Sequence, residues 1–307
     1  MSARITTRRV VVTSLLVDLF DIASNTVVVL LTGSAVIFAE MAQGIADATG
    51  SLLVVIGYWY AGRPRSRAYP IGREREAFFW VLMSALSMLV LGAGLSAWRG
   101  YHQVVDPTPL ERVPLAFGIL VLSICTNGYA FSLSLRKLRQ GGLPLLEAFR
   151  ESRRPLVNMS LVQDGLGTTS SVLGLLALLA CVLGRVDILD GVGALVIASL
   201  MVICSLALVN QARRLIAGRS VPQAVHTQLR ESILTQSDVE AVNSLTAIFA
   251  GADQIEVACD LDLRDELTTN DIETLLDRVE ARIKRDVPEV TTVRIDLNSI
   301  RSSPDHS

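Results

Sequence analysis

The chain has 307 residues, of which 50% are hydrophobic and only 19% are charged, and its mean hydropathy is +0.45. Soluble domains carry about 25% charged residues, so this composition argues against a soluble single-core enzyme, a disordered chain and a nucleic-acid-binding protein. The net charge of −2 conceals an uneven distribution, because basic side chains are in excess over residues 1–212 and acidic ones over 213–307. This asymmetry indicates two parts that face different solvents.

Six stretches are long enough to cross a bilayer as helices, which takes about 20 apolar residues. The first two, from about 10 to 31 and from 34 to 62, each contain two carboxylates and are separated by a tight turn. The other four contain no charged residue: Ala77–Trp98, Val113–Leu135, Gly165–Gly184 and Gly191–Ala212. We therefore predict an all-α transport domain of six transmembrane helices over residues 10–212.

The basic residues predict the orientation of this domain. They concentrate in residues 1–9, in the loops after the second and fourth spans, and at the exit from the sixth span. By the positive-inside rule, both termini are expected in the cytoplasm, with the protein in the plasma (inner) membrane. Arg8 and Arg9 precede an apolar run as in a signal peptide, but no small-residue cleavage site follows, so we expect a retained first span.

Residues 213–300 have the pattern of a small cytoplasmic α+β domain. Its predicted elements follow the order helix, strand, strand, helix, strand, and the second strand, 255–263, alternates strictly between apolar and polar side chains. Asn270 and Glu273 are expected to form a capping box at the start of the second helix. This order predicts an open sheet with helices on one face. Residues 301–307 are polar and are expected to form a disordered tail.

Polar side chains recur at helical spacing inside three of the predicted spans. They are Asp18, Asp21 and Asn25 on the first span, Glu40, Gln43 and Asp47 on the second, and Gln163, Asp164, Thr168 and Ser171 on the fifth. Charge near the bilayer centre is expensive, so buried carboxylates are functional candidates. Stripes of oxygen ligands that turn inward together, without enough Lys or Arg to neutralise them, meet the requirements of a divalent cation site.

Simpler interpretations exist for several of these residues. Asp18 and Asp21 can lie near a span end and reach solvent, and Glu40 can line a water-filled vestibule because it lies close to the turn at 32–34. Gln43 and Gln163, taken alone, can be hydrogen-bonding links between helices. The strongest functional candidates are therefore Asp47, in the middle of its span, and Asp164.

Several motifs together resemble the cation diffusion facilitator family of divalent-metal/proton antiporters. Thr32–Ser34 is followed by Ala39–Asp47 (AEMAQGIAD), which is similar to the family's A-E-A-x-H-S-x-x-D. Tyr69–Trp80 (YPIGREREAFFW) is similar to P-[FY]-G-x-G-R-E-x-x-F-W. Gln163-Asp164 and Asp190-Gly191 resemble the starts of the fifth and sixth spans, the former in a branch with a Glu-Asp pair. The resemblance covers nearly the whole chain.

The resemblance implies a transport site formed by Gln43, Asp47, Gln163 and Asp164, with Glu40 and Asp18 as candidate pathway residues. The family's usual His is Gln43 here, and the branch's usual Glu is Gln163. Amide and carboxylate oxygens favour harder ions such as Mn²⁺ or Fe²⁺, whereas the Irving–Williams order still favours Zn²⁺ over Mn²⁺. The expected cargo is therefore zinc or another transition metal such as manganese, iron or cobalt, and no tightly bound cofactor is expected.

The resemblance also implies efflux of the metal from the cytoplasm by exchange for protons, and a homodimer formed through a ferredoxin-like C-terminal domain. The expected partners are the cation, protons and the lipid bilayer, without nucleic acid. The alternative is a non-transporting membrane metal-binding or regulatory protein with a degenerate site, which Gln43 and Gln163 favour. An enzyme is disfavoured because the spans hold no nucleophile–base pair or His cluster.

A second metal site in the C-terminal domain has little support in the sequence. The ligands it offers are few, namely His226, Asp260, Asp262 and Asp296. A dimerisation domain with solvated acidic side chains is therefore the preferred interpretation. The acidic excess still favours electrostatic attraction of cations.

Overall fold

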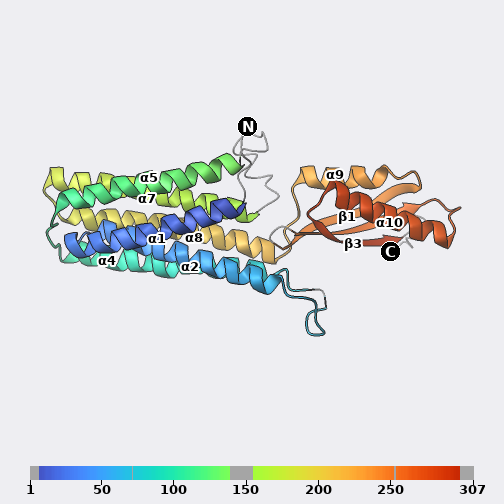
Figure 1. Ribbon diagram of the computed structural model, residues 1–307, viewed down its shortest axis with the longest axis horizontal. Helices are drawn as coiled ribbons and strands as arrows, with labels where there is room; N and C mark the ends of the chain where they lie inside the picture. Colours follow the sequence, from blue (N-terminus) through green and yellow to red (C-terminus); the bar gives the residue numbers. More distant parts are fainter. Residues whose placement is uncertain (1–6, 71, 139–154, 252–253, 298–307) are drawn as a thin grey trace, which may run out of the picture.

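The protein consists of an elongated helical bundle joined end to end to a small domain with a three-stranded sheet (Figure 1). The computed structural model describes the backbone of residues 7–70, 72–138, 155–251 and 254–297, with side chains except those of 7–18, 137–138 and 155–160. The basic residues of 139–154 and the polar tail 301–307, which the sequence singled out, lie outside the described residues.

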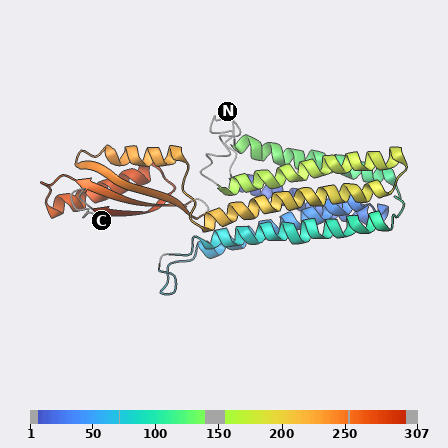
Figure 2. The same cartoon turned by 180° about the vertical axis from the view of Figure 1, so that it is seen from behind.

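The bundle is formed by long helices that run side by side, as both views show (Figures 1 and 2). They are α1 (Thr7–Thr32), α2 (Ala35–Ala61), a continuous helix made of α3 (Glu76–Ser87), a π-helical stretch (Met88–Gly94) and α4 (Leu95–Val105), then α5 (Val113–Leu138), α7 (Pro155–Gly184) and α8 (Ile188–Ile216). Within the described residues, four segments are long and apolar enough to span a membrane: Glu76–Val105, Val113–Arg136, Leu161–Gly184 and Ile188–Ile216. These correspond to the four charge-free runs.

Small residues allow the bundle helices to approach each other closely. A Cβ atom placed on Gly193 of α8 would lie 2.4 Å from the Cβ of Ala177 on α7 and 2.9 Å from Val36 on α2. Gly174 of α7 is similarly close to Val36, at 2.7 Å. Helices in membranes associate largely through such close packing of small residues. The positions of α2, α7 and α8 relative to one another are therefore fixed at these glycines.

We expect Gly193→Ala to destabilise the bundle by about 1–3 kcal/mol, because the added methyl group forces a well-packed contact apart. The measurement is the thermal unfolding midpoint of the purified chain in detergent, which should fall by several degrees. Gly118→Ala is the matched control, because a Cβ at Gly118 on α5 meets nothing within 4 Å. Equal midpoints for the two variants would contradict the packing argument.

The first turn of α2 is held by a carboxylate from α8. Asp190 is fully buried and accepts hydrogen bonds from the Ser34 hydroxyl at 2.6 Å and from the backbone N–H groups of Ala35 at 2.6 Å and Val36 at 3.3 Å. The first N–H groups of a helix have no partner within it, and in an apolar bundle each unpaired group is costly. Asp190 therefore fixes the end of the helix that carries Glu40, Gln43 and Asp47.

The small domain has the predicted order of elements. It contains α9 (Gln223–Leu234), β1 (Val239–Gly251), β2 (Gln254–Leu263), α10 (Thr269–Asp286) and β3 (Val290–Leu297). The strands lie in the order β1-β2-β3, with β1 antiparallel and β3 parallel to β2. Alternate residues of β2 are buried, as the sequence predicted. Asp286 at the end of α10 joins the two helices, since the Ser232 hydroxyl of α9 and Arg282 bind its carboxylate and hold its pKa below the usual range.

The predicted capping box of α10 is wrong by two residues. Thr268, in an extended conformation, is the N-cap, and its hydroxyl accepts from the Asp271 N–H while the Asp271 carboxylate accepts from the Thr268 N–H. Asn270 already lies inside the helix. Both pairs have the residue types and the three-residue spacing of a capping box, so the spacing alone did not distinguish them.

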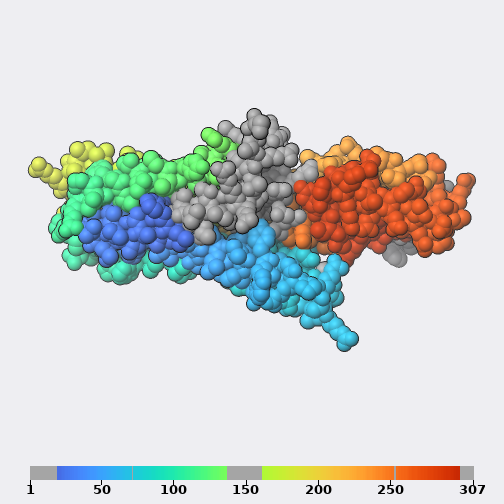
Figure 3. Space-filling model, viewed as in Figure 1, coloured from blue at the N-terminus to red at the C-terminus, as the bar shows by residue number. Residues whose placement is uncertain are grey.

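The junction between the bundle and the small domain is packed. Phe78 of α3 and Leu215 of α8 are fully buried and belong to the hydrophobic core of the sheet domain. The segment between α2 and α3 projects from the body of the molecule beside this junction (Figure 3). The last turn of α8 and the start of α3 thus pack into the core of the sheet domain.

Candidate metal transport site

A ladder of side-chain hydrogen bonds joins α2 to α7 in the interior of the bundle. Its three rungs are Ser171 Oγ to Glu40 Oε2 at 2.6 Å, Ser170 Oγ to Gln43 Oε1 at 2.8 Å, and Gln163 Nε2 to Asp47 Oδ1 at 3.4 Å. The partners run in opposite directions along the chain, so the two helices are antiparallel. Gln163 and Ser171 of the predicted α7 stripe therefore face the predicted stripe of α2, together with Ser170, which the spacing did not single out.

A second polar contact joins α1 to α5. Asp21 is 6% exposed, and its carboxylate accepts from the Asn127 side-chain amide at 2.8 Å and from the Thr126 hydroxyl at 3.2 Å. Gly167 of α7 lies beside this contact, because a Cβ there would be 3.0 Å from Asn127 and 3.4 Å from Gln43. The absence of a side chain at Gly167 brings the two polar contacts together.

A small cavity lies between these two contacts. It is about 10 Å³ in volume, which is close to the minimum for one water molecule, and its lining is polar: Asp21, Glu40, Gln43, Gly44, Asp47 and Asn127. Among the described residues, Glu40 Oε1 has no hydrogen-bond partner although it is buried, and the same holds for Asn25 Oδ1, one helical turn after Asp21 on α1. Oxygen acceptors without donors, next to a water-sized cavity, are suited to a cation or to a proton donor.

The remaining predicted site residues are distributed as follows. The Asp164 carboxylate accepts a hydrogen bond from the Ser134 hydroxyl of α5, whereas the adjacent Gln163 faces Asp47 of α2. Asp18 lies in α1, outside the residues whose side chains are described. Among the described residues, no three His, Cys, Asp or Glu side chains lie close enough to share a metal ion. Any cation site in this conformation therefore includes the amide or hydroxyl groups.

Four polar residues of this region were missed in the sequence: Thr126, Asn127, Ser134 and Ser170. The first three lie in the fourth span, in which no site residue was predicted because the span contains no charged residue. A search for any polar side chain within the apolar runs, rather than for carboxylates alone, would have found them. Their importance depends on which helix they face, and only the packing supplies that information.

The described residues of the small domain provide no comparable cluster. His226 Nε2 lies 3.0 Å from the backbone oxygen of Leu245, which is a packing contact within the domain. Asp260 and Asp296 are paired in register on β2 and β3. Burial, together with these two carboxylates, raises the pKa of the neighbouring Cys259 thiol to about 11. This thiol is therefore protonated at neutral pH and is a poor metal ligand.

Family models match both parts of the chain. The cation efflux transmembrane domain matches residues 11–217, and the cation efflux protein cytoplasmic domain matches residues 221–299. The first model alone covers more than half of the chain. The division at about residue 218 coincides with the end of α8.

Two similar curated proteins have names that refer to metals. The mitochondrial proton-coupled zinc antiporter SLC30A9 of Xenopus laevis is 25% identical over 262 residues, which is 81% of this chain and 46% of that protein. Metal tolerance protein C4 of Arabidopsis thaliana is 20% identical over 240 residues, 77% of this chain and 52% of that protein. The chain thus spans about half the length of the curated relatives it matches. A solved structure of MamM-CTD with two substitutions matches 25% of this chain and 92% of its own, with 18% identity and a TM-score of 0.24.

Proposed function

Because the chain belongs to the cation efflux, or cation diffusion facilitator, family of membrane metal transporters, we propose that it exports a divalent transition-metal cation in exchange for protons. The printed names of its relatives, a proton-coupled zinc antiporter and a metal tolerance protein, support this activity. The observation that carries the proposal is the polar cavity between α1, α2 and α5, inside a bundle with apolar helices on its outside.

We propose that α1 and α2 also cross the membrane, giving six spans. They contain 26 and 27 residues, which at 1.5 Å per residue is about 40 Å of helix and enough for the hydrocarbon core. Their carboxylates Asp21, Glu40 and Asp47 are turned to polar partners on other helices. The arginines near the sheet domain support cytoplasmic termini in the plasma (inner) membrane.

We propose Gln43, Asp47, Gln163 and Asp164 as the transport site, with Glu40 at the cavity and Asp18 along the pathway. The Gln163–Asp47 contact supports this assignment because it joins α2 and α7. Asp164 would reach the site by a rotation of α7 that releases it from Ser134. Such a rearrangement is consistent with two conformations in which the site is open to opposite sides of the membrane.

Proton exchange follows from the charges at this site. Two carboxylates crowded in a low-dielectric environment disfavour joint ionisation, whereas a divalent cation requires both to be deprotonated. Arrival of the cation therefore releases a proton, and a returning proton releases the cation. The absence of imidazole among the proposed ligands favours Mn²⁺ or Fe²⁺ by ligand type, whereas the Irving–Williams order favours Zn²⁺ over Mn²⁺.

The test is transport by the purified chain reconstituted in vesicles that enclose a pH reporter and a metal indicator. Addition of Zn²⁺, Mn²⁺, Fe²⁺ or Co²⁺ in turn should give metal uptake accompanied by proton movement in the opposite direction for at least one ion. Metal uptake without proton movement would contradict exchange. Protein-free vesicles control for leakage.

A second candidate function is a non-transporting membrane metal-binding or regulatory protein. Gln43 and Gln163 favour it, because an amide at both positions leaves fewer charges to bind a cation. A small domain that dimerises through a ferredoxin-like sheet is compatible with either function. Saturable metal binding without flux of any of the four ions would support this candidate and overturn transport.

A further inference from the structure

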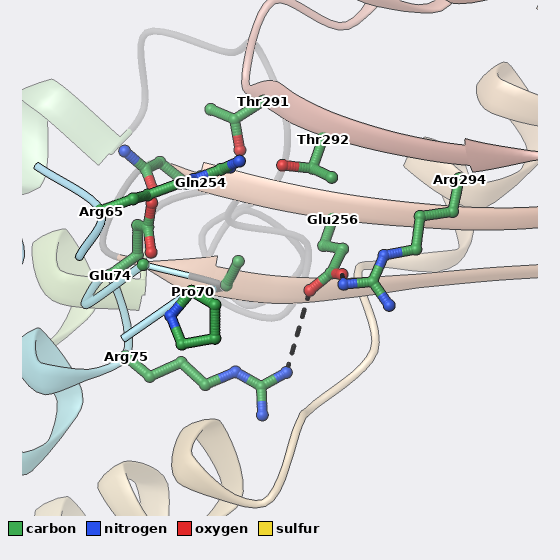
Figure 4. Close-up of a pocket in the computed structure, with 11 residues that line it drawn as sticks. Arg65, Pro70, Glu74, Arg75, Gln254, Glu256, Thr291, Thr292 and Arg294 are labelled. Carbon is green, nitrogen blue, oxygen red and sulfur yellow. Dashed lines mark ion pairs between the residues drawn. The ribbon is translucent and has the colours of Figure 1, made fainter. Parts of the chain in front are cut away.

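A large polar cleft lies at the junction of the bundle and the sheet domain, far from the transport site. Its volume is about 560 Å³, and it lies between the segment that joins α2 to α3 and the ends of the three strands (Figure 4). The cavity of the transport site involves none of its lining residues. The cleft therefore requires an explanation of its own.

Three arginines line this cleft. Arg65 and Arg75 come from the segment between α2 and α3, and Arg294 comes from β3. Glu256 of β2 lies 3.0 Å from Arg294 and 4.0 Å from Arg75, so one carboxylate is shared by two guanidinium groups (Figure 4). The side chains of both arginines remain 57% exposed. The single negative charge of Glu256 therefore does not neutralise both Arg75 and Arg294, and their exposed N–H groups can donate to a ligand.

The second carboxylate in the lining, that of Glu74, forms no ion pair with the described arginines of the cleft, so the excess of positive charge remains. A Cβ on Gly72 would lie 2.1 Å from one carboxylate oxygen of Glu74, so this carboxylate is folded back against the backbone of its own segment. Gly72 has a φ of +111°, which only glycine adopts readily and which permits this close approach. The lining carries three cationic side chains against two anionic ones.

Neutral polar groups complete the lining. The side chains of Gln254, Thr291 and Thr292 lie on the strand side of the cleft (Figure 4). Gln254 Oε1 is buried and has no hydrogen-bond partner in the described part of the chain. An acceptor without a donor, in a cleft lined by guanidinium groups, is complementary to a ligand that carries both an anionic group and a hydroxyl.

The cleft is close to the expected membrane surface. The last turn of α2 contains Trp59 and Tyr60, and the Arg63 guanidinium lies over both rings, at 4.2 and 4.4 Å from their centroids. Aromatic side chains of this kind lie at the membrane interface. Because Arg65 follows directly, lipid headgroups are within reach of the cleft, and basic pockets at this level bind phosphorylated headgroups.

We infer that this cleft binds a phosphate-bearing ligand with a hydroxyl group, held by Arg65, Arg75 and Arg294. Guanidinium groups match the geometry of phosphate oxygens and bind them with two parallel hydrogen bonds. The headgroup of an anionic lipid and a soluble phosphate ester share this chemistry. A ligand that contacts Arg65 and Arg294 together joins the segment after α2 to β3 and stabilises the junction of the two parts.

The test is native mass spectrometry of the full chain, released from nanodiscs of phosphatidylcholine alone or mixed with phosphatidylglycerol. We expect retained phosphatidylglycerol, with binding weakened roughly tenfold by either Arg65→Gln or Arg294→Gln, since each removes charge-assisted hydrogen bonds. Arg67→Gln is the matched control, because Arg67 is exposed on the same segment but does not line the cleft. It should retain full binding.

A second arm uses phosphatidylcholine nanodiscs with soluble glycerol phosphate. Binding in this arm alone, with the same dependence on the arginines, would identify a soluble ester as the ligand. Glu256→Gln should strengthen binding in the productive arm, because it frees two guanidinium groups, whereas a folding defect would weaken it. Absence of binding in both arms, or equal binding by the Arg65, Arg294 and Arg67 variants, would overturn the inference. The readout is binding, so its outcome is independent of which cation is transported.

Discussion

Replacement of Asp47 by Asn is expected to abolish metal-driven proton flux in reconstituted vesicles. Asp47 lies in the middle of α2, lines the polar cavity and accepts from Gln163 of α7. The substitution preserves size and hydrogen bonding but removes the negative charge. Loss of one charged partner of a buried cation costs about 3–5 kcal/mol, which corresponds to a loss of affinity of at least about a hundredfold.

Asp164→Asn should have the same effect if α7 rotates to bring this carboxylate into the site. Asp106→Asn, in the exposed segment after α4, is the control and should transport normally. Flux is measured with the pH reporter, and folding is checked by thermal unfolding of each variant. Undiminished flux in the Asp47 variant would eliminate Asp47 from the site, and undiminished flux in the Asp164 variant would mean that Ser134 retains Asp164 throughout the cycle.

Asp190→Ala is expected to have the largest effect on stability. It leaves the Ser34 hydroxyl and the N–H groups of Ala35 and Val36 without their acceptor in a fully buried position. Each buried donor left unsatisfied costs about 1–3 kcal/mol, so we expect a total loss of about 3 kcal/mol or more. The measurement is thermal unfolding of the purified chain in detergent.

The conservative variant Asp190→Asn should lose less stability, because its amide oxygen still accepts from one or two of these donors. Asp187→Asn is the matched control three residues earlier, at a position that makes no side-chain cap to the start of α8. An Asp190→Ala variant as stable as the Asp187→Asn control would show that the first turn of α2 does not depend on this carboxylate. Proton flux is a second readout of the same variant. If Asp190→Ala lowers the flux without lowering the stability, then the contact of Asp190 with α2 also positions Asp47.

The sequence was most informative where a pattern repeats within one element. The four charge-free runs correspond to the four apolar spans, and the alternation of 255–263 corresponds to the half-buried strand β2. The stripe of Glu40, Gln43 and Asp47 was predicted to turn inward, and in the structure it contacts α7. In each case the information is local, because a period of two or of 3.6 residues identifies a face without reference to any partner.

The structure was needed wherever two distant elements meet. Asp190 was noted only as part of a motif, yet it caps a helix that begins 155 residues earlier in the chain. Asn127 and Ser134 appeared to be ordinary members of an apolar run, yet they bind Asp21 and Asp164. These pairings depend on how far each helix is rotated and shifted along its axis, and no periodicity within a single helix contains that information.

The sequence by itself thus determined the two-part organisation, the membrane character of the first part and the presence of costly carboxylates within it. Tertiary structure alone decided which side chains meet around the cavity and which arginines converge at the domain junction. The physical reason is that close contacts at Gly167, Gly174 and Gly193 set the spacing and register of neighbouring helices. Polar groups far apart in the sequence are therefore brought together by that packing.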